Sequence, residues 1–198
     1  MTREVVDVRR EPGVETELVE RARRGDREAF SVLAAGAVDR LYAIARLILR
    51  DTGLAEDATQ DALVHAWRSL PTLRDAERFD AWLHRLLIRS CSDIGRRQRR
   101  WRTEMSVVPI EPAEPDSVAS LADRDQIERG LRRLNEAQRT ILVLHFYVGL
   151  SPAEAAAALE IPVGTAKSRL HYAIEALRAA LAADERTKVG TAREGRLA

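Results

Sequence analysis

Residues 150–170, LSPAEAAAALEIPVGTAKSRL, decide the fold of the C-terminal half of the chain. Ser151 suits the N-cap of a helix, Pro152 suits its first position, and Glu154 can complete a capping box. The three alanines at 156–158 leave little side-chain bulk, so another helix can approach closely there. This segment therefore predicts a short helix that packs tightly against a neighbour.

A second helix follows this short one after a tight turn. Pro162 cannot continue the first helix and favours the start of the next. Two helices joined in this way match the helix-turn-helix plan, whose second helix enters the major groove of DNA. Its outward side chains combine hydroxyls, cations and rings, which suit contacts with phosphates and base edges. They are Thr165, Lys167, Ser168, Arg169, His171 and Tyr172. The same pattern also fits the solvated face of an ordinary helical hairpin.

Apolar residues repeat with the 3.6-residue period of a helix along most of the remaining chain. No stretch alternates between apolar and polar residues over the length of a strand, and aromatic residues make up only 5% of the chain. We therefore expect an all-α fold. The expected helices cover residues 16–24, 26–50, 54–70 and 79–99, followed by 122–134, 136–148, 152–159 and 162–182.

The segment MSVVPIEPAEPDSVAS, residues 105–120, interrupts this helical pattern with three prolines, three acids and no cation. Proline removes helical hydrogen bonds and the like charges repel, so we expect an extended linker. The alternative is a surface loop within a single domain. The expected plan has two small domains, 16–102 and 121–182, joined by a linker at 103–120, with flexible tails at 1–15 and 183–198.

Charge is balanced over the whole chain but not locally. Lys and Arg number 32 against 31 Asp and Glu, which gives a net charge of +1. The segment DTGLAEDATQD, residues 51–61, holds four acids and no cation. Asp57 and Asp61 share one helical face with Gln60 beside them. The helix dipole explains an acid near the helix start, such as Asp57, but not Asp61 further along. This face is a candidate surface for a partner protein.

The opposite charge gathers at the end of the helix expected over 79–99. Residues 85–102 hold seven arginines and one acid, and five of the arginines surround Trp101. Cations at the C-terminus of a helix are mildly favourable, but one or two would suffice for that role. Five cations around an aromatic ring fit a surface that follows a nucleic-acid backbone and stacks on a base.

With these motifs, the sequence resembles a known family, the extracytoplasmic-function group of sigma-70-type RNA polymerase sigma factors. The resemblance runs from about Ala22 to Leu181. In the first expected domain it rests on REAF (27–30), LAEDATQDALVHAW (54–67), RFDAWLHRLL (78–87) and DIGRRQRR (93–100). In the second it rests on the continuous stretch 134–181, which includes the expected helix-turn-helix. The resemblance implies that 16–102 is sigma region 2 and that 121–182 is sigma region 4.

The resemblance also implies partners and roles. The chain would bind core RNA polymerase through its β′ coiled coil and β flap, with Asp57, Gln60 and Asp61 facing the coiled coil. The loop at 70–78 and the next helix would melt and read the −10 promoter element, with Trp82, Arg85, Arg89, Arg96 and Arg97 as candidates. The stretch 163–172 would read the −35 element, and the acidic linker would thread toward the polymerase channels. An anti-sigma protein is a possible inhibitor.

The chain departs from the family pattern at three places. The family often has Asn where this chain has Arg89, and usually Gly in the helix-turn-helix turn where this chain has Glu160. A left-handed residue other than glycine costs on the order of 1 kcal/mol there, unless the turn differs. His171 and Tyr172 replace the residues common in the −35 reader. The promoter sequence therefore does not carry over.

Nothing in the sequence indicates a catalytic or metal site. There is no phosphate-binding glycine loop, no dinucleotide fingerprint and no zinc-protease motif. The four histidines lack metal-ligand spacing, and Cys91 stands alone and is expected to be a small buried hydrophobe. We expect no enzyme activity, no cofactor, no metal, no membrane insertion and a cytoplasmic location. The competing interpretation is a stand-alone helix-turn-helix regulator that binds an operator.

Overall fold

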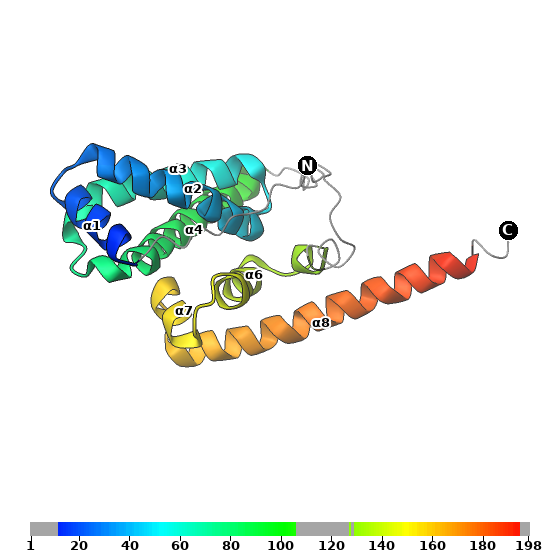
Figure 1. The fold of residues 1–198 in the computed structure, drawn as a ribbon. Coiled ribbons are helices and arrows are strands. Elements are labelled where there is room, and N and C mark those ends of the chain that lie inside the picture. Colours follow the sequence, from blue (N-terminus) through cyan, green and yellow to red (C-terminus); the bar gives the residue numbers. More distant parts are fainter. Residues whose placement is uncertain (1–11, 106–126, 128, 195–198) are drawn as a thin grey trace, which may run out of the picture.

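The structure is a computed structural model that describes the backbone of residues 12–105, 127 and 129–194. Every regular element in these ranges is a helix, which confirms the predicted all-α fold. Helices α1 to α4 form one group, and α6 to α8 form a second group beneath it in Figure 1. None of the described helices combines the length and apolarity needed to cross a bilayer.

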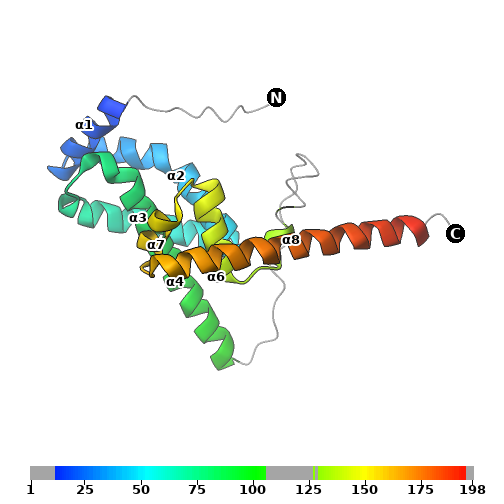
Figure 2. The same cartoon turned by 90° about the horizontal axis from the view of Figure 1, so that it is seen from below.

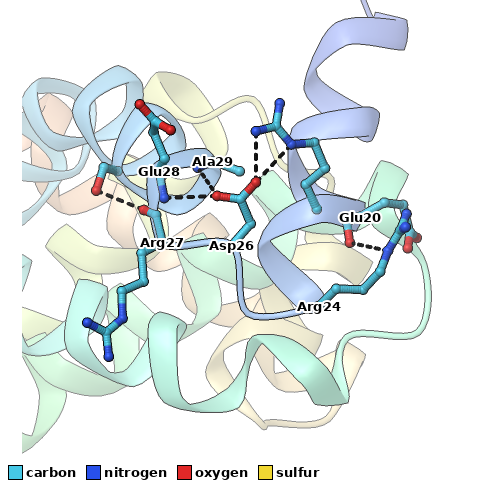
Figure 3. Close-up of polar contacts among 8 residues, drawn as sticks. Glu20, Arg24, Asp26, Arg27, Glu28 and Ala29 are labelled. Atoms are coloured by element: carbon cyan, nitrogen blue, oxygen red, sulfur yellow. Dashed lines mark hydrogen bonds and ion pairs between the residues drawn. The ribbon is translucent and has the colours of Figure 1, made fainter.

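The first group begins with a helical hairpin, α1 (Pro12–Arg23) and α2 (Arg27–Leu49). The turn between them depends on Gly25, whose φ of 92° is open to glycine at little cost. Asp26 caps α2 because its carboxylate accepts hydrogen bonds of 3.0 Å from the backbone N–H groups of Glu28 and Ala29, as Figure 3 shows. These bonds, together with the paired Arg21, lower the pKa of Asp26.

Two further helices complete the first core. Helix α3 (Thr52–Ser69) leads through short 3-10 turns at Leu70–Thr72 and Ala76–Arg78 into α4 (Phe79–Met105). The buried side of α3 consists mostly of alanines, which allow its axis to approach α2 and α4 closely. Larger side chains from α2 and α4 fill the centre, and they include Leu33, Leu41, Ile44, Ile48, Leu83 and Leu87.

The second group contains the expected helix-turn-helix. Helix α6 (Glu136–Leu142) continues into a π-helical turn, η3 (Val143–Tyr147), and α7 (Pro152–Leu159) and α8 (Val163–Glu194) follow. The predicted capping box is present, since Ser151 and Glu154 exchange hydrogen bonds of 2.8 and 3.2 Å. Ala156 and Ala158 are buried, which fits the predicted close approach of another helix, whereas Ala157 faces solvent.

Several predicted boundaries change. The helix predicted over 79–99 runs to Met105, and the helix predicted over 162–182 runs to Glu194, well into the expected tail. Figures 1 and 2 both show α8 projecting beyond the rest of the second group. Local helix propensity without a breaking proline explains both extensions. Residues 106–120 of the expected linker lie outside the described residues, as do 1–11 and 195–198.

Each of the two groups of helices contributes a buried side chain to the hydrophobic core of the other. Ile88 of α4 is 2% exposed and belongs to the core of the second group. Val143 at the end of α6 is 3% exposed and belongs to the core of the first group. Helix α7 packs against α4, and α6 packs against the C-terminal part of α2. The helix-turn-helix thus packs directly against the first group of helices.

Candidate nucleic-acid interface and neighbouring surfaces

The acidic face predicted on α3 lies beside an open groove of about 840 Å³ between α2 and α3. Gln60 lines this groove, whereas Asp57 and Asp61 do not line it and are the sequence neighbours of the lining residues Glu56 and Gln60. The groove walls are mainly apolar, with Phe30 and Trp67 in ring contact at a centroid distance of 5.0 Å. The charged residues that line it are the acids Asp39 and Glu56 and the cation Arg68. This surface can receive an apolar side chain flanked by cations.

The candidate residues on α4 form a stripe. Successive residues turn by about 100° around a helix, so Trp82, Arg85, Arg89 and Arg96 lie within about 60° of one another. Arg97 lies about 100° away from Arg96 and therefore off this stripe. We refer to these four stripe residues as the α4 stripe. It flanks the side of α4 that packs on the second group.

Two arginines of the α4 stripe already have carboxylate partners. Arg96 pairs with Asp93 within the same helix. Arg89 pairs with Glu160, which lies in the turn between α7 and α8. Both members of the second pair are more than half exposed, at 57% and 63% of their side-chain surface. Arg89 and Glu160 are two of the three departures noted in the sequence, and the structure brings them together.

The predicted reading helix presents its first turns to solvent. Ala166, Leu170 and Ala173 are buried on the inner side of α8. The predicted contact residues lie on the other sides, where all are exposed except the half-buried Arg169: Thr165, Lys167, Ser168, Arg169, His171 and Tyr172. The Ser168 hydroxyl donates to the Thr165 carbonyl at 3.1 Å, and the rings of His171 and Tyr172 meet edge to face. The start of α8 is thus free to enter a groove of DNA.

The turn before this helix has the strain expected from the sequence. Glu160 has a φ of 55° and a ψ of 42°, which is the left-handed region. The N–H of Ile161 donates to the Ala156 carbonyl at 3.0 Å and closes the turn. The turn therefore keeps its ordinary shape in spite of a side chain at the position of glycine, and the side chain of Glu160 points to Arg89.

Three buried titratable groups have strongly shifted pKa values. Burial lowers the pKa of Arg139 to about 10 and of His84 to about 4, and it raises the pKa of Cys91 to about 12. Cys91 is 1% exposed, which confirms its prediction as a buried hydrophobe. Arg139 was not predicted, because nothing near it in the sequence indicates burial of a cation.

No group of three or more metal-binding side chains occurs among the residues that the structure describes. His65 is exposed, and His145 accepts or donates a 2.8 Å hydrogen bond at the Leu150 carbonyl. These histidines pack or face solvent. The candidate surfaces on α3, α4 and α8 offer charged, hydrogen-bonding and apolar side chains, and such surfaces suit binding to macromolecules.

Two family models match the chain. The model described as sigma-70 region 2 matches residues 35–102, and the model described as sigma-70, region 4 matches residues 124–177. The RNA polymerase sigma-H factor of Pseudomonas aeruginosa is 30% identical over 178 residues, which cover 83% of this chain and 92% of that protein. The ECF RNA polymerase sigma factor SigM of Mycobacterium tuberculosis is 35% identical over 147 residues, which cover 73% of each chain.

Two solved structures are similar in fold. The sigma factor RpoE from Bartonella quintana, in complex with the anti-sigma factor NepR, matches with a TM-score of 0.66 and 28% identity over 78% of this chain and 98% of its own. CnrH, in complex with the cytosolic domain of CnrY, matches with a TM-score of 0.61 and 29% identity over 86% of this chain and 98% of its own.

Proposed function

The chain belongs to the extracytoplasmic-function sigma factors of the sigma-70 family, and on this premise we propose how its surfaces divide the work. Its function is promoter-directed initiation of transcription together with core RNA polymerase. The observation that carries this function is the presence, in order on one chain, of both sigma-70 regions. A stand-alone operator-binding regulator is not favoured, because it has no use for region 2.

The first domain, which we place at residues 16–102, is proposed to hold the polymerase. Asp57, Gln60 and Asp61 are the proposed contacts with the coiled coil of β′. Their support is the position of Gln60 in the lining of the α2–α3 groove, with Asp57 and Asp61 next in sequence to the lining residues Glu56 and Gln60. An apolar groove lined by more acids than cations is complementary to a basic amphipathic helix.

The α4 stripe is proposed to read the −10 element and to hold the opened strand. Single-stranded DNA is bound by cations that follow the phosphates and by rings on which bases stack. Trp82 is half-buried against Phe79, with the ring centroids 6.0 Å apart, which fixes its orientation. Arg85, Arg89 and Arg96 supply the cations, and Arg97 is a further candidate beside the stripe.

The second domain, at residues 121–182, is proposed to read the −35 element and to contact the β flap. The start of α8 enters the major groove with Thr165, Lys167, Ser168, Arg169, His171 and Tyr172 facing the DNA. The support is their outward position on a helix whose inner side is fixed by α7. The region 103–120 is proposed to link the two domains.

We also propose an anti-sigma protein as a regulatory partner. The similar structures of RpoE and CnrH contain NepR and the cytosolic domain of CnrY, respectively. Such a partner can bind in the apolar α2–α3 groove. A partner bound there would block the polymerase from the same surface. The polymerase supplies the chemistry of RNA synthesis, so the chain itself needs no catalytic residue, and it acts in the cytoplasm where the polymerase works.

In vitro transcription with purified core polymerase on genomic fragments tests this proposal. We expect the chain to direct the polymerase to defined start sites and to bind free promoter duplex only weakly. A gel shift of duplex DNA by the chain alone, without any start site on addition of core polymerase, contradicts the function and favours the operator-binding regulator.

A further inference from the structure

An ion pair connects the middle of α2 to the first turn of α4. A guanidinium nitrogen of Arg40 donates to a carboxylate oxygen of Asp80 at 2.5 Å, although the two residues are 40 positions apart in the chain. The pair Arg96–Asp93, by contrast, joins residues three positions apart within one helix. The Arg40–Asp80 pair therefore constrains how two helices lie relative to each other, which a local pair does not.

A buried histidine lies one helical turn beyond Asp80 on the same side of α4. His84 is 8% exposed, and its Nε2 is buried without a hydrogen-bond partner among the residues that the structure describes. Burial and the nearby Arg40 lower its pKa to about 4, whereas Asp80 acts in the opposite direction. The imidazole is therefore neutral near pH 7, and it does not compete with Arg40 for the carboxylate of Asp80.

The side of α4 that carries Asp80 and His84 is nearly opposite to the side that carries Trp82. Successive residues turn by about 100° around a helix, so Trp82 lies about 160° from each of the other two. Trp82 instead contacts Phe79, which is 4% exposed and whose ring centroid is 6.0 Å away. The first turn of α4 is thus held by Arg40 and by Phe79, and it presents Trp82 on its other side.

The segment just before α4 adds little to this anchoring. The 3-10 turn Ala76–Arg78 leads directly into Phe79, and none of its three residues is fully buried. Its N-cap residue, Asp75, accepts a hydrogen bond of 3.1 Å from the N–H of Glu77, which is a contact within the turn itself. The position of the first turn of α4 therefore depends on the contacts that this turn makes with α2 and with the core.

We propose that Arg40 is a positioning residue for the −10 element: it holds Asp80, fixes the first turn of α4 against α2 and thereby sets where Trp82 meets the DNA. Arg40 acts through Asp80 rather than on the DNA. The inference rests on the proposed function, because that function assigns Trp82 to the −10 element. Both side chains of the pair are nearly half exposed, at 45% and 44%, so the expected effects are a few-fold.

Fluorine NMR of the full chain, labelled with 5-fluorotryptophan, tests the positioning in the absence of polymerase. The chain has three tryptophans, and the variant Trp82→Phe identifies the resonance of Trp82. We expect Arg40→Gln to displace this resonance by more than its linewidth, because the first turn of α4 loses its tie to α2. Asp80→Asn should give the same displacement, and the double variant should add nothing further, since both changes break one contact.

Binding of single-stranded −10 DNA measures the consequence for function. The probe is a labelled oligonucleotide with the −10 sequence of a promoter mapped by in vitro transcription, and it is titrated with the chain bound to core polymerase. We expect Arg40→Gln to weaken this binding by about twofold to fivefold and to leave core binding unchanged. The swap Arg40→Glu/Asp80→Arg restores opposite charges and should return the affinity and the Trp82 resonance toward their native values.

The control Arg27→Gln removes an exposed cation from the same helix and should alter neither the spectrum nor the affinity. Three results overturn the positioning role. The first is an unchanged Trp82 resonance in Arg40→Gln. The second is a swapped pair that binds as weakly as Arg40→Gln, which means that the Arg40 guanidinium contacts the DNA itself. The third is an equal loss of affinity in Arg27→Gln, which means that overall charge decides the binding.

Failure of the native chain to direct core polymerase to any start site overturns the proposed function instead. The fluorine spectra of the free chain do not depend on that result, so the two failures are distinguishable.

Discussion

Arg139 and Ile48 are 91 residues apart in the chain, and the guanidinium of one donates a 2.7 Å hydrogen bond to the carbonyl of the other. This bond joins the helix before the helix-turn-helix to the end of α2. It gives a buried cation a partner and satisfies a carbonyl at a helix C-terminus. The two domains of this sigma factor are therefore connected by specific main-chain contacts as well as by the segment between them.

The substitution Arg139→Met should loosen the contact between the domains. It keeps the apolar stem but removes both donors, which leaves the carbonyls of Ile48 and Leu134 buried without them. Because a hydrogen bond to a charged group is worth about 1.5–3 kcal/mol, we expect the free energy of unfolding to fall by about 2 kcal/mol. Urea titration followed by circular dichroism measures this loss. Arg178→Met, on the exposed side of α8, is the control and should change stability by less than about 0.5 kcal/mol.

Stability should depend on pH through His84. Burial lowers its pKa to about 4, the nearby Arg40 acts in the same direction, and Asp80 opposes them. Below pH 6.5 His84 binds a proton in the unfolded chain but stays neutral in the folded chain. Stability therefore falls as pH falls and levels off near pH 4. Between pH 7.5 and 5 this group alone accounts for about 2 kcal/mol.

The variant His84→Leu isolates this contribution, because a leucine does not titrate. Its unfolding free energy, measured by urea titration across the same range, should depend less on pH than that of the native chain. The exposed His65→Leu serves as the comparison and should keep the native dependence. Equal pH dependence in His84→Leu and the native chain would contradict the assignment.

Asp61→Arg should weaken polymerase binding more than tenfold while the melting temperature stays near that of the native chain. Asp61 is half-buried and follows Gln60, which lines the α2–α3 groove, and reversal of its charge places a cation where we propose that cations of the partner bind. Co-purification with tagged core polymerase measures the effect. Glu17→Arg, an exposed acid on α1, makes the same charge change away from this face. Native recovery of the Asp61→Arg chain would show that the face is assigned wrongly.

Lys167→Ala should weaken binding to −35 DNA within the polymerase complex for all promoter sequences alike. A lysine acts on phosphate as a point charge, so its loss should reduce the salt dependence by about one counterion. Titrations at several salt concentrations measure both quantities. Arg178→Ala removes a cation eleven positions further along α8 and should leave the salt slope unchanged. A sequence-selective loss in Lys167→Ala would instead assign this residue to a base edge.

The candidate sites differ in how much of each could be predicted from the sequence. The outward residues of the reading helix follow from helical spacing, and the structure exposes them except for the half-buried Arg169. The candidates on α4 came from the family resemblance, and of the stripe residues Arg89 and Arg96 have exposed side chains whereas Trp82 is half-buried. Arg97 was a candidate on the same resemblance, and it lies off the stripe because it is about 100° from Arg96 around the helix. The groove beside Asp57 was not foreseen, because its walls come from both α2 and α3. In the sequence, the sign of this groove is that apolar residues, such as Val38 and Val64, occur on the outer faces of two helices.

The sequence by itself determined the all-α fold, the capped helix start at Ser151, and the helix-turn-helix, because caps, breakers and periodicity act over a few neighbouring residues. Only the tertiary structure decided that Glu160 meets Arg89 and that Arg139 lies buried on the end of α2. A helical pattern states which side of a helix is apolar but not which element covers it. Contacts between residues 71 and 91 positions apart form only when two separately specified domains pack together.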